Sequence, residues 1–223
     1  MTTKSIDSTR ERERPPLAKA PAADRPTTAF VDLEALAHNF QEVRRRADGR
    51  KVLAVVKAQA YGHGAVRVSR RLLGLGADTL GVALVEEGRE LREAGIGAPI
   101  VVMGAVFPDQ ADALVTLRLT PVVFTTEMAR TLSGAARARK TRIPVHVKID
   151  TGMGRVGIAP EAALAFIEEL MDLAGITVQG LMTHFADADL QDKQFASMQI
   201  SRFETLLKAL DARGIAIPRA SSA

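Results

Sequence analysis

The stretch V-L-A-V-V-K-A-Q-A-Y-G-H-G, Val52–Gly64, indicates how the rest of the chain folds. Its first five residues, Val52–Val56, form a continuous apolar run, which is typical of a strand buried on both faces of a parallel sheet. Lys57 follows directly, and a buried ammonium group is costly unless it finds a partner or performs chemistry. Loss of its proton, or attachment to a carbonyl compound, removes that cost. Lys57 is therefore either a strand-end lysine that reaches solvent or a reactive amine.

The composition excludes several classes of protein. The 223 residues are 47% apolar and 25% charged, which is ordinary for a globular protein, and cysteine is absent. Disulfides, thiol catalysis and thiolate metal sites are thereby excluded, and we expect no metal. Because no apolar run approaches the ~20 residues of a membrane span and no signal peptide is recognisable, we expect a cytoplasmic protein without a membrane partner.

The charge pattern argues against a nucleic-acid partner. The chain carries 30 basic and 26 acidic residues, and they are interspersed. Basic residues such as Arg44, Arg45 and Arg46 are expected on solvated helix faces, and no aromatic residues lie between them.

The chain begins with a segment that has no apolar period. Residues 1–28 are rich in Arg, Pro, Ala, Ser and Thr, and prolines recur through them. We therefore predict a disordered tail over residues 1–28 and one folded domain over residues 29–223.

Within the predicted domain, strand patterns alternate with helix patterns after a first helix at Leu33–Arg46. Strands are predicted at Val52–Val56, Thr79–Val82, Ile100–Met103, Thr120–Phe124, Val145–Ile149, Ile176–Thr183 and from about Ile215. Helices are predicted at Ala65–Leu73, Val85–Glu93, Asp109–Leu117, Glu127–Ala138, Glu161–Leu173 and Asp192–Ala212.

Strict alternation predicts an α/β fold with parallel strands and crossover helices. Seven strands in succession fit a (β/α)8 TIM-type barrel, of which the eighth unit is missing. A barrel without its closing strand leaves two open sheet edges, so we expect a fragment of a longer protein that lacks a C-terminal β domain. The alternative is an open α/β sheet of six or seven strands that is complete as it stands.

Polar side chains follow several of the predicted strands. Lys57 and Tyr61 follow the first, and the fifth strand, V-H-V-K-I-D, continues into the glycine-rich loop T-G-M-G-R-V-G with Arg155. Alternation along that strand predicts that His146, Lys148 and Asp150 face the barrel interior. The glycines allow the backbone to approach a ligand closely.

Two further segments carry such groups. L-M-T-H-F-A after the sixth strand contains His184, and P-R-A-S-S-A after the seventh contains Ser221 and Ser222, whose hydroxyls suit a phosphate. Because active sites of parallel barrels lie at the carboxyl ends of the strands, we expect these side chains to converge there. Each also has a structural reading: a packing tyrosine, a buried polar network, a structural histidine.

These segments resemble the alanine racemase family. V-V-K-A-Q-A-Y-G-H-G, Val55–Gly64, is similar to its cofactor-lysine motif, with Gln59 where asparagine is usual. Lys148–Arg155 matches the fixed positions of K-x-D-T-G-M-G-R, and Thr183–Ala186 matches T-H-F-A. The last match, to A-N-S-A, has Ser221 in place of asparagine.

The resemblance implies a site for pyridoxal 5′-phosphate (PLP). The implied roles are covalent attachment of PLP to Lys57, phosphate contacts from Tyr61 and Ser222, a hydrogen bond from Arg155 to the phenolic oxygen, stacking of His184 on the ring, and carbamylation of Lys148.

The implied reaction is interconversion of L-alanine and D-alanine, which supplies D-alanine for cell-wall peptidoglycan. Lys57 would serve one face of the substrate, and the family takes the second acid–base from a tyrosine in the C-terminal β domain of a partner subunit. Tyr61 is the only tyrosine here, so we expect the chain alone to be weakly active or inactive. The family is homodimeric because its subunits share their active sites. The segment that is shared is absent here, so the resemblance does not extend to a homodimer of this chain. Alternatives are a stand-alone PLP-binding barrel without racemase activity, a racemase for another small amino acid such as serine, and a non-catalytic module that holds an anion.

Overall fold

The computed structural model describes residues 28–221. Most of the predicted tail, residues 1–27, and the predicted phosphate contact Ser222 therefore lie outside the described residues. The chain divides into two units, Met1–Asp32 and Leu33–Ala223, and every helix and strand below belongs to the second. The domain boundary predicted after residue 28 stays a prediction.

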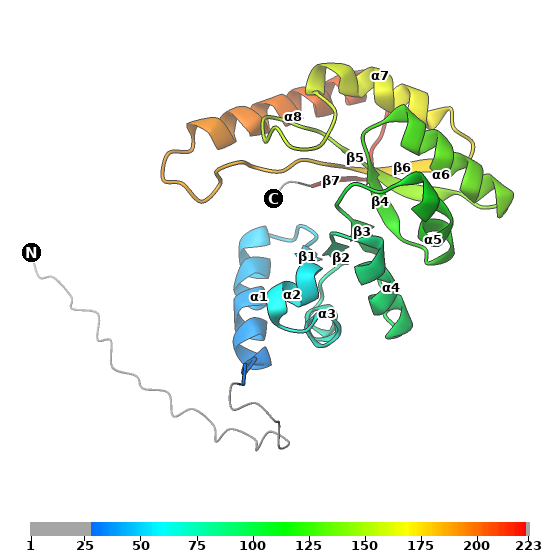
Figure 1. The fold of residues 1–223 in the computed structure, drawn as a ribbon. Coiled ribbons are helices and arrows are strands. Elements are labelled where there is room, and N and C mark those ends of the chain that lie inside the picture. Colours follow the sequence, from blue (N-terminus) through cyan, green and yellow to red (C-terminus); the bar gives the residue numbers. More distant parts are fainter. Residues whose placement is uncertain (1–27, 222–223) are drawn as a thin grey trace, which may run out of the picture. The chain divides into compact units, whose positions relative to one another are not determined.

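Seven parallel strands form one sheet in chain order (Figure 1). They are β1 (Leu53–Val55), β2 (Thr79–Val82), β3 (Ile100–Val102), β4 (Thr120–Val123), β5 (Ile143–Lys148), β6 (Ile176–Met182) and β7 (Arg219–Ser221). Each strand pairs with the next in parallel register, so the order has no switch point of the kind found in doubly wound sheets. This confirms an incomplete (β/α)8 barrel, in which β1 and β7 are the edges of the described sheet.

One helix precedes β1, and the others connect the successive strands. They are α1 (Leu33–Ala47), α2 (Lys57–Gly62), α3 (Ala65–Gly74), α4 (Val85–Glu93), α5 (Ala111–Thr116), α6 (Thr126–Ala138), α7 (Pro160–Met171) and α8 (Gln194–Ala212), with a 3₁₀ turn, η1 (Pro108–Gln110), before α5. None of the helices within residues 28–221 is both long and apolar enough to cross a membrane.

Most predicted elements are confirmed within a few residues; the last strand starts later than predicted, and one short helix was not predicted. The predicted strand from Ile215 begins only at Arg219, because the Ile215 N–H closes the end of α8 on Leu210 O and Pro218 has no N–H for a sheet. The short α2 was not predicted, because its backbone is left-handed, as described below.

The core is mostly aliphatic. Strands β2, β3 and β4 are buried along their whole length, and each large aliphatic side chain that they remove from water contributes about 1.5–3 kcal/mol. Fully buried examples are Leu80, Ile100, Leu114, Leu132 and Ile167. This rigid sheet fixes the strand ends from which the site is built.

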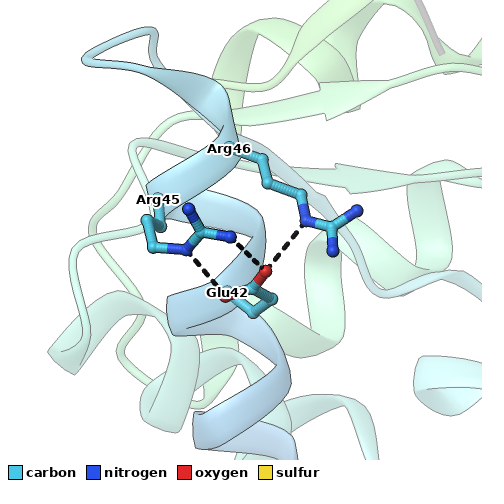
Figure 2. Close-up of polar contacts among 3 residues, drawn as sticks. All are labelled: Glu42, Arg45 and Arg46. Atoms are coloured by element: carbon cyan, nitrogen blue, oxygen red, sulfur yellow. Dashed lines mark hydrogen bonds and ion pairs between the residues drawn. The ribbon is translucent and has the colours of Figure 1, made fainter. Parts of the chain in front are cut away.

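The end of α1 carries the run of three arginines as a largely solvated face. Figure 2 shows the Glu42 carboxylate accepting hydrogen bonds from Arg45 and Arg46, and the two guanidinium groups hold the pKa of Glu42 down to about 2. Arg45 and Arg46 are 70% and 74% exposed, so these pairs add little stability. Arg44 instead donates to Leu75 O and Gly76 O at the end of α3.

Candidate functional site

A cavity of about 990 Å³ opens at the carboxyl ends of the strands. It brings together the predicted side chains Lys57, Tyr61, Lys148, Arg155 and His184. It continues through the interior of the sheet to the amino ends of β1 and β2, where residues 49–53 and Asp78 line it. These five side chains therefore share one cavity, and the roles predicted for them stay predictions.

The backbone after β1 turns the left-handed way. Residues Ala58 to Tyr61 have φ between 49° and 56° and ψ between 41° and 51°, which is left-handed helical geometry. For residues other than glycine this conformation costs roughly 1–2 kcal/mol each. Strain of this size persists only where the surroundings enforce it, and such segments cluster at functional sites.

The turn brings Lys57 and Tyr61 to the same side of the cavity. The Lys57 Nζ lies 5.8 Å from the centre of the Tyr61 ring, within the range of a cation–π contact. Tyr61 is 61% exposed, so it is not a packing residue of this unit. Lys57 is half-buried and lines the cavity, so its amine is placed to meet a ligand there.

Strand β5 places two titratable groups in the cavity. Lys148 is 7% exposed, and burial, helped by the positive charge of Arg155 and opposed by Asp150, lowers its pKa to about 8. His146 is 3% exposed, and burial together with the charge of Arg219 lowers its pKa to about 4. Neither imidazole nitrogen of His146 has a hydrogen-bond partner among the described residues.

Asp150 does not line the cavity, in contrast to the inward position predicted from strand alternation. Strand β5 ends at Lys148, and the Asp150 carboxylate accepts N–H bonds of 3.0 Å from Gly152 and Gly154. Burial raises its pKa, but these and neighbouring backbone donors outweigh burial and lower the pKa overall. Gly152 and Gly154 have φ of 144° and 70°, so only glycine fits this loop easily. The carboxylate therefore shapes the loop that carries Arg155 to the cavity.

A buried polar network joins that loop to the segment after β6. The Thr151 and Thr183 hydroxyls are 2.7 Å apart, and the fully buried Gln199 of α8 donates to Thr151 Oγ1 and to His184 O. The Gln199 oxygen accepts the Ala186 N–H at 3.0 Å. The network thereby fixes the backbone on both sides of His184.

Ser221, the residue before the predicted phosphate contact Ser222, forms hydrogen bonds within the sheet. Ser221 lines the cavity, but its hydroxyl donates to Leu181 O and its carbonyl accepts the Thr183 N–H. The phosphate contact assigned to Ser222 stays a prediction, because that residue lies outside the described range.

Two residues near the site were not predicted from the sequence. Gln199 lies within α8, and the apolar pattern of that helix does not indicate which loop the side chain contacts. Glu87 is the third residue of α4 and accepts the Ala58 N–H beside Lys57. The sequence did contain a signal for Glu87, since a glutamate in the first turn of a helix can accept hydrogen bonds from the free backbone N–H groups before it.

No group of three or more His, Cys, Asp or Glu side chains placed to hold a metal ion occurs within residues 28–221. The ionisable groups that line the cavity are mostly amines, guanidinium groups and imidazoles, with the phenol of Tyr61 and the carboxylate of Asp78.

Comparisons with known proteins agree on one family. The family model described as alanine racemase, N-terminal domain, matches residues 31–223. The alanine racemase of Carboxydothermus hydrogenoformans is 44% identical over 86% of this chain and 52% of its own length. The alanine racemase of Desulforamulus reducens is 43% identical over 85% of this chain and 52% of its own length.

Solved structures give the same result. An alanine racemase of Clostridium difficile 630, in complex with cycloserine, has a TM-score of 0.81 at 33% identity, over 86% of this chain and 52% of that chain. The alanine racemase of Streptomyces lavendulae has a TM-score of 0.81 at 30% identity, over 86% of this chain and 51% of that chain. This chain therefore spans about half the length of the relatives that it matches.

Proposed function

Because the chain belongs to the alanine racemase family, whose members depend on PLP, we propose that it binds this cofactor and supplies one half of an alanine racemase site. The observation that carries the proposal is the convergence of Lys57, Arg155 and His184 on one cavity at the strand ends. The reaction proposed is interconversion of L-alanine and D-alanine, in the cytoplasm, as a source of D-alanine for peptidoglycan.

The residues of the cavity fit PLP. Its volume of about 990 Å³ is ample for a cofactor of this size, which needs a concave site with a few fixed polar groups. An amine for the aldehyde, a guanidinium for the phenolic oxygen and an imidazole for the ring face come from Lys57, Arg155 and His184. Tyr61, and in the prediction Ser222, serve the phosphate. When bound, PLP supplies an electron sink for the charge that develops at the substrate Cα.

We infer that Lys57 is the acid–base on one face of the substrate. Its half-buried amine lies at the end of β1, held by a turn of fixed geometry, so it approaches the cavity from one direction. As a free amine it can take the Cα proton, and as an ammonium it can return one.

The opposite face needs a different group. Tyr61 is the only tyrosine of the chain, and it lies beside Lys57 rather than across the cavity from it. We therefore propose that the second acid–base comes from another polypeptide segment, and that this chain alone racemises alanine weakly or not at all.

Lys148 is proposed to be carbamylated. Its lowered pKa raises the share of unprotonated amine near neutral pH, and the unprotonated amine is the form that adds to carbon dioxide. The new N–C bond forms as the amine releases a proton to solvent, and the product is a carbamate anion. That anion would pair with Arg155, whose positive charge now helps to lower the Lys148 pKa.

Borohydride reduction of the chain with PLP, followed by peptide mapping, tests the proposal. We expect the pyridoxyl group on Lys57, and its loss from this peptide in Lys57→Ala. Lys51→Ala is the matched control, because Lys51 lines the same cavity at its other end and should leave the labelling of Lys57 unchanged. An unlabelled Lys57 in the unmodified chain would overturn the proposal and favour a module that only holds an anion.

A further inference from the structure

The left-handed turn between Lys57 and Tyr61 needs an external support. Its four residues, from Ala58 to Tyr61, all have positive φ, and none of them is glycine. Alanine, glutamine and tyrosine favour the right-handed helix, so local preference works against this backbone. Support for the turn comes from α4, which contacts α2.

The main contact is the carboxylate of Glu87. Its Oε1 accepts the Ala58 N–H at 2.6 Å, and its Oε2 accepts the Ala83 N–H at 2.7 Å and the Leu84 N–H at 3.0 Å. One carboxylate thus joins the residue after Lys57 to the loop between β2 and α4. Hydrogen bonds to a charged acceptor are worth about 1.5–3 kcal/mol each, comparable with the cost of a left-handed residue.

A second contact supports the same turn. The Gln59 side chain donates to Glu90 Oε2 at 2.6 Å and accepts the Ala65 N–H at 3.3 Å. Gln59 is exposed, so water competes with this contact and it contributes less than the Glu87 bonds. Glu87 and Glu90 lie three residues apart, on one side of α4.

We propose that Glu87 is a positioning residue that fixes the direction of the Lys57 amine. The Ala58 N–H belongs to the peptide bond that joins Lys57 to Ala58, so holding it fixes the backbone from which the lysine side chain starts. The role given to Lys57 rests on the proposed function, whereas the support of the turn by Glu87 does not.

Two variants distinguish the loss of the Glu87 hydrogen bonds from the loss of a negative charge on α4. Glu87→Gln keeps the size of the side chain but has one acceptor oxygen, so it can serve the Ala58 N–H or the loop N–H groups but not both sets. Glu86→Gln removes the same charge from the neighbouring, exposed residue of α4 and is the matched control.

Two measurements test the proposal in the chain. Amide hydrogen exchange over Lys57–Gly62 should become roughly tenfold faster in Glu87→Gln, because one charge-assisted bond is lost. The rate of pyridoxyl labelling at Lys57, relative to Lys51 in the same sample, should fall roughly tenfold, because the amine no longer approaches in one fixed direction. Glu86→Gln should match the unmodified chain in both.

The possible outcomes are distinct. Unchanged exchange and unchanged relative labelling in Glu87→Gln would overturn the proposal. If the unmodified chain is not labelled on Lys57, the proposed function fails, and hydrogen exchange alone still decides the role of Glu87. If Glu87→Gln does not fold, the unmodified chain decides: Ala58 is exposed, so its amide should be protected by the Glu87 bond, and exchange as fast as in an unstructured peptide would refute the assignment.

Discussion

Gln199 and Thr151 are 48 residues apart in the chain, and their buried side chains are joined by a hydrogen bond of 3.1 Å from Gln199 Nε2 to Thr151 Oγ1. The same amide nitrogen donates to His184 O, and the amide oxygen accepts the Ala186 N–H. One side chain of α8 therefore ties the loop that carries Arg155 to the segment that carries His184.

Replacing this amide should destabilise the protein. In Gln199→Leu the buried Thr151 hydroxyl loses a donor, and the part-buried His184 O and Ala186 N–H also lose a partner. An unsatisfied buried group costs about 1–3 kcal/mol, and a part-buried one costs less because water can replace the partner. We expect the free energy of unfolding, measured in urea, to fall by at least about 2 kcal/mol. Gln194→Leu, at the exposed start of α8, should change it by less than about 0.5 kcal/mol. Equal effects of the two substitutions would contradict the structural role of the amide.

The sequence predicted the elements whose signal is local. Apolar runs such as Val52–Val56 marked the buried strands, and the rule that parallel strands share one functional edge predicted the convergence of Lys57, Arg155 and His184. Family motifs then predicted the chemistry assigned to these side chains. Each of these inferences depends on residues that lie close together in the chain.

The sequence did not predict features that depend on distant partners. The left-handed turn runs against the preferences of Ala58 to Tyr61 and exists because α4 supplies acceptors from almost thirty residues away. Asp150 alternates correctly for an inward side chain, but strand β5 ends before it and the N–H groups of the glycine loop turn its carboxylate to themselves. The partners of Gln199 are likewise set by tertiary packing.

Arg92 should be sensitive even to lysine. Its guanidinium donates to four carbonyl groups, those of Ile96, Ala98, Leu117 and Arg118, at 2.6–2.9 Å, and so joins α4 to the loop before β3 and the turn after α5. A lysine has three donors on one atom and cannot reproduce this fork. We expect Arg92→Lys to lower the free energy of unfolding by about 2–3 kcal/mol.

Arg89→Lys is the control for that experiment, because Arg89 is an exposed residue of the same helix. Its effect in the same urea titration should be within about 0.5 kcal/mol of zero. A tolerated Arg92→Lys would mean that the four carbonyl groups find water when the fork is removed.

Gly180 should not accept a methyl group. A Cβ at this position would lie 2.8 Å from Nε2 of the buried His146 ring, on the neighbouring strand. Overpacking of this kind costs about 1–3 kcal/mol, so Gly180→Ala should lower the thermal midpoint. In a His146→Ala background the same substitution should cost less, and the double-mutant cycle measures the difference.

Gly134→Ala is the matched change with the opposite expected sign. Gly134 is exposed within α6, and nothing lies within 4 Å of an added Cβ. Alanine in a helix is favoured over glycine by about 0.5–1 kcal/mol, so this variant should be more stable than the unmodified chain. If both glycine substitutions change stability in the same direction, contact with His146 is not the cause.

Lys148 should make stability depend on alkaline pH. Its pKa is about 8 in the folded chain against an ordinary value of 10.5, so between these pH values the unfolded chain binds the additional proton. Stability therefore rises with pH through this window, is greatest above pH 10.5 and is lost as pH falls through 8. The full effect is at most about 3.5 kcal/mol, since one pKa unit corresponds to about 1.4 kcal/mol.

Lys148→Met isolates this dependence, because methionine has a similar length and no charge. In carbon-dioxide-free buffer, the variant should be more stable than the unmodified chain at pH 8, and this advantage should shrink towards pH 10.5. The stability difference between Lys51→Met and the unmodified chain, measured over the same pH window, should show no such trend, since Lys51 is exposed.

Adding bicarbonate at pH 8 should stabilise the unmodified chain and leave Lys148→Met unchanged, because carbamylation would replace a buried cation by an anion that Arg155 can pair with. A Lys148→Met advantage that is the same at both pH values would show that folding does not change the protonation of Lys148, and hence that its pKa is not lowered in the fold.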